Sequence, residues 1–380
     1  MSMNKTILSV FGTRPEAIKM APLLKLLDKS EAIESLVCVT AQHRHMLDQV
    51  MNLFDIKPDF DLDIMQPGQN LFDITCNVML KFKSILERVK PDIVLVHGDT
   101  TTTMAASLAS YYNKIKVGHV EAGLRTYNKY SPFPEEINRR ITGVVTDMHF
   151  APTQIAKDNL IKERIPEKSI YITGNTVIDS LLYISNMIDC NSTTMKELEE
   201  QFKFIDKHKK LILVTGHRRE NFGGGFDNIC NALYRVANDR SDTVIVYPVH
   251  FNPNVRETVF NILGDKVNND IYLIEPLDYL PFVYLMKRSY IILTDSGGVQ
   301  EEAPSLGKPV LVMRDTTERP EAIEAGTVKL VGTSKERIYK SIIELLDNDE
   351  LYCAMASAHN PYGDGLAAQR IINILQNTNI

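Results

Sequence analysis

The sequence has none of the features of a disulfide-bonded, membrane-spanning or nucleic-acid-binding protein. Its five cysteines are an odd number, lie far apart and form no CxxC pair, so neither a disulfide framework nor a structural zinc site is expected, and we predict buried reduced thiols. No stretch has the roughly 18 uncharged apolar residues of a membrane span. A net charge of −6 argues against a basic surface for nucleic acid.

Two further absences narrow the class of protein. The start of the chain, MSMNKTILSVFGTRPEA, lacks the basic end, apolar block and small-residue cleavage site of a secretory signal, which predicts a cytoplasmic protein. A nicotinamide enzyme would have the pattern GxGxxG after its first strand, but the sequence there is FGTRPE, with Gly12 alone. A bound NAD is therefore not expected.

The pattern that is present is typical of α/β proteins. Short apolar runs alternate with segments of helical period, as in a parallel sheet covered on both faces by helices. With 380 residues, the chain is long enough for two such doubly wound, Rossmann-like domains. The runs that predict strands are TILSVFG, SLVCVT, DIVLVHG, VGHVEAG, MHFAPT and SIYITG in the first part, and KLILVTGHR, TVIVYPVH, DIYLIEP, YIILTDS, KPVLVM and TVKLVG in the second.

A polar stretch, residues 189–210, separates the two sets of runs. The helical segment VIDSLLYISNM follows the strand that closes the first set, so we place the boundary before Thr173. The first domain then covers residues 1–172, and the second starts at residue 173.

Ligands of open α/β sheets bind outside the carboxyl ends of the strands. The most polar and glycine-rich segments of the chain lie at these ends: FGTRPE, VHGDTTTT, VEAGLRT, TGHRREN, YPVH and TDSGG. Because two such edges can face each other, we predict a ligand-binding cleft between the domains.

Candidate ligand-binding side chains follow the early strands. Arg14 lies in a tight strand-to-helix turn before Pro15, and Lys19 lies about one turn further on, so both could bind a phosphate. The alternative is a surface arginine and a solvated lysine. Asp99 directly follows a buried strand, where it could cap the next helix, face the cleft or do both.

Two more carboxylate positions stand out in the first domain. Glu121 ends a strand of otherwise apolar or small residues, and an ion there is costly unless it is paired or used in function. Arg125, four residues on, is its expected structural partner. Glu135 and Glu136 fall in the first turn of a helix, where the dipole favours carboxylates, so we expect one of them only to support the helix.

The first loop of the second domain concentrates possible cations. TGHRRENFGGGF places His217, Arg218 and Arg219 before three glycines, which predicts a phosphate-binding loop or, alternatively, a flexible surface turn. His217 could also donate a proton, because the pKa of histidine can lie near neutrality.

A helix start later in the second domain suggests a nucleotide. In LTDSGGVQEEAPSL, the backbone N–H groups of residues 296–298 can bind phosphate oxygens, while Glu302 can accept hydrogen bonds from a vicinal diol. Arg319 offers a further cation. Phosphate plus diol describes a nucleotide, and a capped structural helix is the alternative.

Nine segments, in matching order over essentially the whole chain, resemble the non-hydrolysing UDP-N-acetylglucosamine 2-epimerases in their enterobacterial form. They are VFGTRPEAIKMAPL, VHGDTTTT, GHVEAGLRT, SPFPEEINR, TGNTVID, TGHRREN, YPVHFNPNVRE, LTDSGGVQEEAPSLGKPVLVMRDTTERPEA and HNPYGDG.

This resemblance implies a fold and an activity. The fold is two facing Rossmann-like domains of GT-B type, with the active site in the cleft and the last helix, residues 366–380, returning to the first domain, which leaves 173–365 as the second. The activity is reversible conversion of UDP-GlcNAc to UDP-ManNAc, a precursor of surface polysaccharides, without NAD or a metal. Members are typically homodimers.

The resemblance also implies the site residues. By residue-for-residue match, the catalytic carboxylates are Asp99, Glu121 and Glu135, with His217 as their partner. The implied substrate-binding residues are Arg14, Lys19, Phe282, Ser296, Gly297, Gly298, Glu302 and Arg319.

The chemistry explains why such charges are needed. The hydrogen at C2 is not next to a carbonyl, but if UDP leaves C1, loss of the C2 proton gives 2-acetamidoglucal, and the cations would neutralise the departing diphosphate. Inversion needs acid/base groups on both faces of C2, so we assign Glu121 and Glu135 to the proton transfers and Asp99 to tuning or relaying them. Crowding of carboxylates is expected to raise at least one pKa.

Family members also have a second UDP-GlcNAc site, used for allosteric activation, near the stretch matched here by Gln42 to Leu47. Gly68 stands where some relatives have an arginine, so the regulatory contacts are not carried over. Other hypotheses are a glycosyltransferase of the same fold, a hydrolysing relative that releases free ManNAc, and a sensor without turnover. The three carboxylates favour the epimerase, because a sensor has no need of them.

Overall fold

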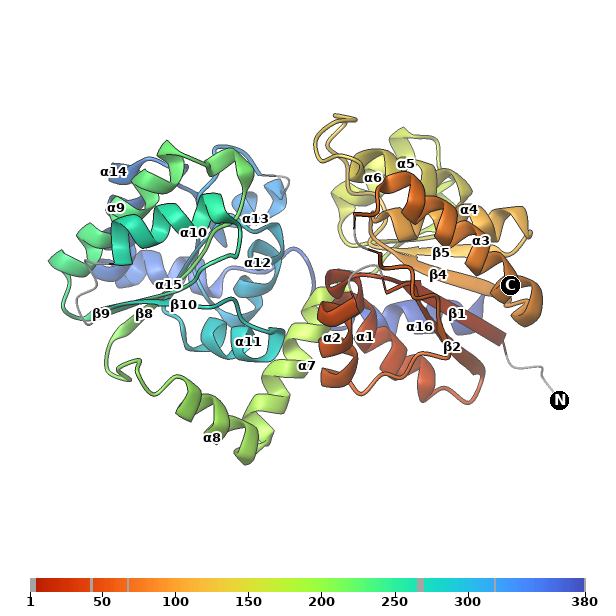
Figure 1. Ribbon diagram of the computed structural model, residues 1–380, viewed down its shortest axis with the longest axis horizontal. Helices are drawn as coiled ribbons and strands as arrows, with labels where there is room; N and C mark the ends of the chain where they lie inside the picture. The colour runs from red at the N-terminus through yellow and green to blue at the C-terminus, as the bar shows by residue number, and fades with distance from the viewer. Residues whose placement is uncertain (1–4, 42–43, 67, 265–269, 318, 379–380) are drawn as a thin grey trace. The chain divides into compact units, whose positions relative to one another are not determined.

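The computed structural model describes residues 5–41, 44–66, 68–264, 270–317 and 319–378 (Figure 1). By internal contacts, the chain divides into two units: Met1–Ser180 with Tyr362–Ile380, and Leu181–Pro361. The division falls inside α7 (Thr176–Cys190). The boundary expected before Thr173 stays a prediction.

The sheet of the first unit is parallel and has the strand order β3-β2-β1-β4-β5-β6-β7 among the described residues. The runs that predicted strands here are confirmed, and the two-residue β3 is an addition. The order changes direction between β1 and β4, the switch point at which such sheets bind ligands. The strands are β1 (Lys5–Phe11), β2 (Ile33–Val39), β3 (Phe60–Asp61), β4 (Ile93–His97), β5 (Lys116–Val120), β6 (Met148–Ala151) and β7 (Ile170–Ile172).

Helices cover this sheet with apolar faces, as α3 illustrates. In α3, the buried residues Ile74, Val78, Phe82 and Leu86 recur at helical spacing and pack on the strands together with α4. The helices of the unit are α1 (Arg14–Asp28), α2 (Arg44–Leu53), α3 (Leu71–Val89), α4 (Thr101–Tyr112), α5 (Glu135–Val145), α6 (Gln154–Lys162), η1 (Glu167–Ser169), the start of α7, and α16 (Ala367–Asn377).

The C-terminal helix α16 belongs to the first unit, where it lies next to α1 (Figure 1). The carboxylate of Asp179 accepts the backbone N–H groups of Ala367 and Ala368 at 3.2 and 2.8 Å. The ammonium of Lys5 donates to the carbonyl of Leu375 at 2.8 Å. These contacts fix both ends of α16 to the unit.

The second unit repeats the same plan, with a parallel sheet in the order β10-β9-β8-β11-β12-β13 among the described residues. All of the predicted strands are confirmed, and the switch point lies between β8 and β11. The elements are α8 (Ser192–Gln201), β8 (Lys210–Thr215), η2 (Arg219–Asn221), α9 (Gly224–Asp239), β9 (Thr243–Pro248), α10 (Pro253–Val259), η3 (Phe260–Gly264), β10 (Ile271–Ile274), α11 (Tyr279–Arg288), β11 (Ile291–Thr294), α12 (Gly297–Glu302), η4 (Ala303–Leu306), β12 (Val310–Val312), α13 (Pro320–Glu324), β13 (Val328–Leu330), α14 (Lys335–Asp347) and α15 (Asp349–Ser357).

The cysteines correct one expectation. All five are free, but only Cys38 and Cys230 are buried, whereas Cys76, Cys190 and Cys353 are exposed. The prediction of buried thiols is wrong for these three because they lie on outward faces of helices. Within the described ranges, none of the helices combines the length and apolar character needed to cross a lipid bilayer.

Two buried histidines lie side by side in the first sheet. His119 of β5 and His149 of β6 are partners in the strand register and are 1% and 0% exposed. Burial lowers the pKa of each imidazole to about 3, so both are neutral in the folded protein at ordinary pH.

We expect the free energy of unfolding to fall as the pH is lowered below about 6.5. The unfolded chain takes up protons at histidines of ordinary pKa, while the folded chain does not, which favours unfolding by up to about 1.4 kcal/mol per pH unit for each histidine. Denaturant titrations of the wild type and His149→Gln between about pH 7 and about pH 5 measure this dependence. The variant should show the smaller slope against pH, and equal slopes would contradict a neutral buried His149.

Candidate active site

A buried carboxylate joins the two loops at the switch point of the first unit. Glu16, in the first turn of α1, is 2% exposed and accepts the backbone N–H groups of Gly12 and Thr13 at 3.0 and 2.8 Å. The hydroxyls of Thr100 and Thr103 donate to its other oxygen at 2.7 and 3.1 Å. Glu16 thereby fixes the loop after β1 against the start of α4.

A cavity of about 450 Å³ lies at this edge of the first sheet. Its lining includes Arg14, Asp99 and Glu135, together with Thr13, Thr100 and Asn138. The structure therefore brings three of the candidate residues to one cavity within the first unit.

Asp99 is held by helix α5. Its carboxylate lies 2.7 Å from a guanidinium nitrogen of Arg139, and its backbone carbonyl accepts the side-chain amide of Asn138 at 2.9 Å. Asp99 does not cap α4, because Thr100 is the N-cap and accepts the backbone N–H of Thr103 at 3.1 Å. Capping thus does not account for the acid at this position.

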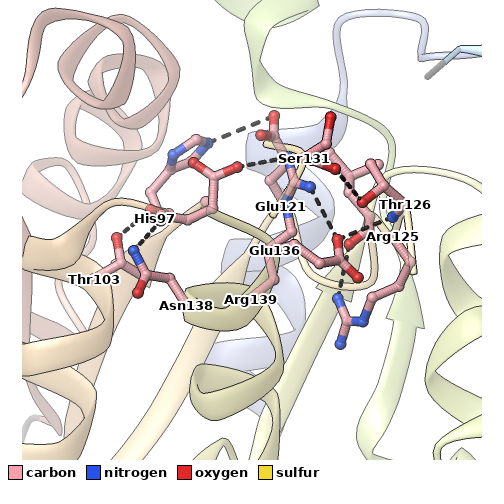
Figure 2. Close-up of polar contacts among 12 residues, drawn as sticks. His97, Thr103, Glu121, Arg125, Thr126, Ser131, Glu136, Asn138 and Arg139 are labelled. Atoms are coloured by element: carbon pink, nitrogen blue, oxygen red, sulfur yellow. Dashed lines mark hydrogen bonds and ion pairs between the residues drawn. The ribbon is translucent and has the colours of Figure 1, made fainter. Parts of the chain in front are cut away.

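Glu121 lies just past the end of β5 with a left-handed backbone, φ +64°, which is strained for a residue with a side chain. Its carboxylate forms an ion pair with Lys19 and accepts the amide of Asn175 at 2.9 Å. The same carboxylate lies 3.8 Å from Nε2 of His97 (Figure 2). Lys19 is therefore not a solvated lysine, and its role towards a phosphate stays a prediction. Burial lowers the pKa of His97 to about 4, so this ring is neutral beside Glu121.

The expectation that Arg125 is the partner of Glu121 is wrong. Its guanidinium, 0% exposed, instead donates to both carboxylate oxygens of Glu163 at 2.9 and 2.8 Å, and its remaining nitrogen donates to the carbonyl of Leu124 at 2.8 Å. Residue spacing suggested the wrong pair because the chain turns away from β5 between the two residues.

The two glutamates at the start of α5 have different surroundings. Glu136 is 1% exposed and accepts the backbone N–H groups of Thr126 and Tyr127 at 2.9 and 3.0 Å, which is the supporting role expected of one of the pair. Oε2 of Glu135 is buried and has no hydrogen-bond partner among the described residues. Glu135 is therefore the member of the pair that is available for another role.

The loop after β8 in the second unit is anchored. Asp295, at the end of β11, is 0% exposed and accepts the backbone N–H groups of His217 and Arg218 at 2.9 and 2.8 Å and the side-chain amide of Asn221 at 3.2 Å. A flexible surface turn does not fit these contacts.

The predicted phosphate-binding helix start also has a cation beside it. A Cβ added to Gly297 would lie 2.9 Å from Cζ of Arg319, so this guanidinium lies directly against the first turn of α12. Its Nε donates to Glu301 at 2.9 Å. The side chain of Ser296, the N-cap, makes no capping hydrogen bond.

Glu302 is paired with a tyrosine that the sequence did not suggest. The hydroxyl of Tyr279, at the start of α11, donates to Oε1 of Glu302 at 2.7 Å, and both residues are buried. A Cβ on Gly298 would lie 3.8 Å from the other oxygen, Oε2, which therefore faces the helix start. Phe282 lies half-buried on α11.

Among the residues that sequence reasoning missed, only Glu16 had a local signal. Thr13 and Glu16 have the spacing of a capping box, and the structure shows that box. Arg139, Asn175, Tyr279 and Asp295 act through partners far away in the sequence, and no local pattern marks such residues.

The chain is similar to known proteins over nearly its whole length. The family model described as UDP-N-acetylglucosamine 2-epimerase matches residues 25–376. A UDP-N-acetylglucosamine 2-epimerase of Escherichia coli K12 is 59% identical over 374 residues, covering 98% of this chain and 99% of that protein.

Two solved structures of UDP-GlcNAc 2-epimerases also match the chain over nearly its whole length. The crystal structure of UDP-GlcNAc 2-epimerase from Neisseria meningitidis bound to UDP-GlcNAc matches with a TM-score of 0.92 and 54% identity, covering 98% of this chain and 100% of that one. The Methanocaldococcus jannaschii enzyme in complex with UDP-GlcNAc and UDP matches with a TM-score of 0.81 and 34% identity, covering 98% and 100%.

Replacing Arg125 by methionine should lower the free energy of unfolding by about 3 kcal/mol, because it leaves the Glu163 carboxylate without its buried partner. Lys83→Met is the matched control, since Lys83 lies 3.6 Å from Glu87 in an exposed pair and its loss should cost about 1 kcal/mol or less. Chemical denaturation of the three proteins gives the comparison. Equal stability of the two variants would contradict a structural role for the Arg125–Glu163 pair.

Proposed function

The chain belongs to the UDP-N-acetylglucosamine 2-epimerase family and is an epimerase, and we propose that it inverts C2 of UDP-GlcNAc to give UDP-ManNAc. The ligand named for two solved relatives supports this substrate. The observation that supports the proposal most is the gathering of Asp99, Glu121 and Glu135 at one edge of the first sheet, each in a different environment.

The proposed reaction is an elimination followed by a re-addition. The C1–O bond to the diphosphate breaks, the C2 proton moves to a carboxylate, and the sugar becomes 2-acetamidoglucal with a C1–C2 double bond. A proton then adds to the opposite face of C2, and an oxygen of UDP adds back to C1. Atoms and electrons balance without an oxidant or reductant. The expectation that neither NAD nor a metal is needed stays a prediction.

Loss of UDP requires that its negative charge be neutralised as it leaves. In the second unit, we assign this to the backbone N–H groups of residues 296–298 and to Arg319, which lies against Gly297. In the first unit, we assign it to Arg14, which has neither a hydrogen bond nor an ion pair with another described residue and lines the cavity. The uridine ribose is assigned to Glu302, and Phe282 to the same nucleotide.

The two proton transfers are assigned to Glu121 and Glu135. Glu121 is fixed in position by its ion pair with Lys19 and by the hydrogen bond from Asn175, which suits a base that must meet C2 in a defined direction. Glu135 has a buried oxygen without a partner among the described residues, so it can give or take a proton without first breaking a contact. Asp99, held by Arg139, is assigned to tuning or relaying these transfers.

Further parts of the proposal concern the setting of the reaction. We propose a cytoplasmic homodimer that supplies UDP-ManNAc for cell-surface polysaccharides. Activation by a second UDP-GlcNAc also stays a proposal, since Gln42 and His43 of the implied stretch lie outside the described residues.

Incubation with UDP-GlcNAc in deuterated water tests the reaction. The mechanism predicts UDP-ManNAc with deuterium at C2, and deuterium also entering the recovered UDP-GlcNAc, because the proton removed exchanges before return. NMR of the sugar nucleotides follows both. Net formation of free ManNAc would indicate a hydrolysing enzyme, turnover only with an added acceptor would indicate a glycosyltransferase, and an unchanged substrate would indicate a sensor.

Glu121→Gln tests the assignment of the base. We expect kcat to fall by at least about 100-fold, because a proton acceptor is lost, while the Kd for UDP changes by less than about threefold. Glu167→Gln is the control, because Glu167 is an exposed partner of Lys157 and its replacement should change neither quantity. Calorimetry and rates of UDP-ManNAc formation give the two numbers. A loss of UDP affinity as large as the loss of kcat would mean that Glu121 has another role.

A further inference from the structure

The two carboxylate oxygens of Asp295 differ in their hydrogen bonding. Oδ2 accepts three hydrogen bonds, from the backbone N–H groups of His217 and Arg218 and the side chain of Asn221, at 2.9, 2.8 and 3.2 Å. Oδ1 is buried and makes no hydrogen bond with the described residues. A buried carboxylate oxygen without a donor is costly, so a structural role in holding the loop does not account for it.

The ring of His217 faces this oxygen. Its Nδ1 lies 3.3 Å from Oδ1 of Asp295, so a small rotation of the ring completes a hydrogen bond. The His217 side chain is 41% exposed while that of Asp295 is 0% exposed, so a ligand can reach the imidazole but not the carboxylate behind it.

We infer that Asp295 is a positioning residue for His217: it accepts the Nδ1–H of the ring and thereby leaves Nε2 as the nitrogen offered to the substrate. This inference rests on the proposed function, and within it we assign His217 to the departing diphosphate. When the ring is an imidazolium, its Nε2 proton can pass to the diphosphate oxygen as the C1–O bond breaks. The proton returns to Nε2 during re-addition. The carboxylate stabilises the imidazolium form and fixes the direction of the ring, as in other buried acid–histidine pairs.

Several charged or titratable groups surround the ring. Burial lowers the pKa of His217 most, Asp295 raises it, and Arg218 on the same loop and His250 on the loop after β9 lower it. The His250 ring is stacked at 5.6 Å, and its Nδ1 accepts the backbone N–H of Asn252, so it does not compete for Oδ1. The buried hydroxyl of Tyr247 lies next to Gly216, and its pKa is raised by burial first and also by the charges of Cys230 and Asp295. Removal of the Asp295 charge should therefore lower the pKa of His217 further.

The first test uses the wild type alone. Nitrogen NMR of ¹⁵N-histidine-labelled protein, with the His217 signal assigned by its loss in His217→Gln, reports which ring nitrogen holds the proton in the neutral form. We expect Nδ1–H, although an isolated imidazole in water prefers Nε2–H. Observation of Nε2–H for His217 would overturn the inference, and this test does not depend on the folding of any Asp295 variant.

The second test is a double-mutant cycle. Asp295→Asn should lower kcat by about tenfold or more with little change in KM, and should move the limb of the pH–rate profile that depends on His217 to lower pH. In the His217→Gln background, the same substitution should have no further effect on kcat. Asp242→Asn, which removes a carboxylate paired with Arg240 at the surface of the same unit, is the control and should leave kcat and the pH profile unchanged.

The outcomes separate this inference from the proposed function. A low kcat in His217→Gln together with a normal kcat in Asp295→Asn, or independent effects of the two substitutions, would overturn the positioning role alone. Full kcat in His217→Gln would remove His217 from the proposed reaction, and with it this assignment, while turnover in deuterated water would still support the epimerisation itself.

Discussion

The structure depends on buried carboxylates at the switch points of the two sheets. In each sheet, one such carboxylate accepts hydrogen bonds from the loop next to the switch point. Glu16 accepts two successive backbone N–H groups of the loop after β1 and the hydroxyls of two threonines at the start of α4. Asp295, just after β11, accepts two successive N–H groups of the loop after β8. In a parallel sheet these loops have no strand partners of their own, so the acids supply the contacts that the sheet does not. The same constraint therefore shapes the loops that hold Arg14 and Asp99 in one unit and His217 in the other.

Three acids of the same chemical type acquire different properties from their neighbours. Asp99 lies against the guanidinium of Arg139, Glu121 against the ammonium of Lys19, and Glu135 has a buried oxygen without a partner among the described residues. The proposed reaction needs two opposed proton transfers, and such different surroundings allow acids of the same type to take different roles in it. The strained backbone of Glu121 at φ +64° fits a residue held in place for function rather than for packing.

Sequence reasoning succeeded where the pattern is local. Continuous apolar runs predicted the strands of both sheets, because strands buried on both faces have little choice of residue. It failed where a contact joins distant segments: Arg125 pairs with Glu163 instead of Glu121, and Asp295 gives no sign in the sequence that it faces His217. The strand β3 was not predicted, because two residues are too few to show an alternation of apolar and polar side chains. The positions at strand ends and helix starts marked most of the site residues as candidates, but they left structural alternatives open. The family resemblance supplied the catalytic roles and Phe282.

The central claim is that acids of the first unit exchange the proton at C2 of the sugar. A crystal structure of this chain with UDP-GlcNAc bound tests it most directly. The account predicts the carboxylates of Glu121 and Glu135 on opposite faces of the hexose ring, each within about 3.5 Å of C2 or joined to it through one water. A hexose with both carboxylates on the same face, or with either one remote from C2, would contradict it.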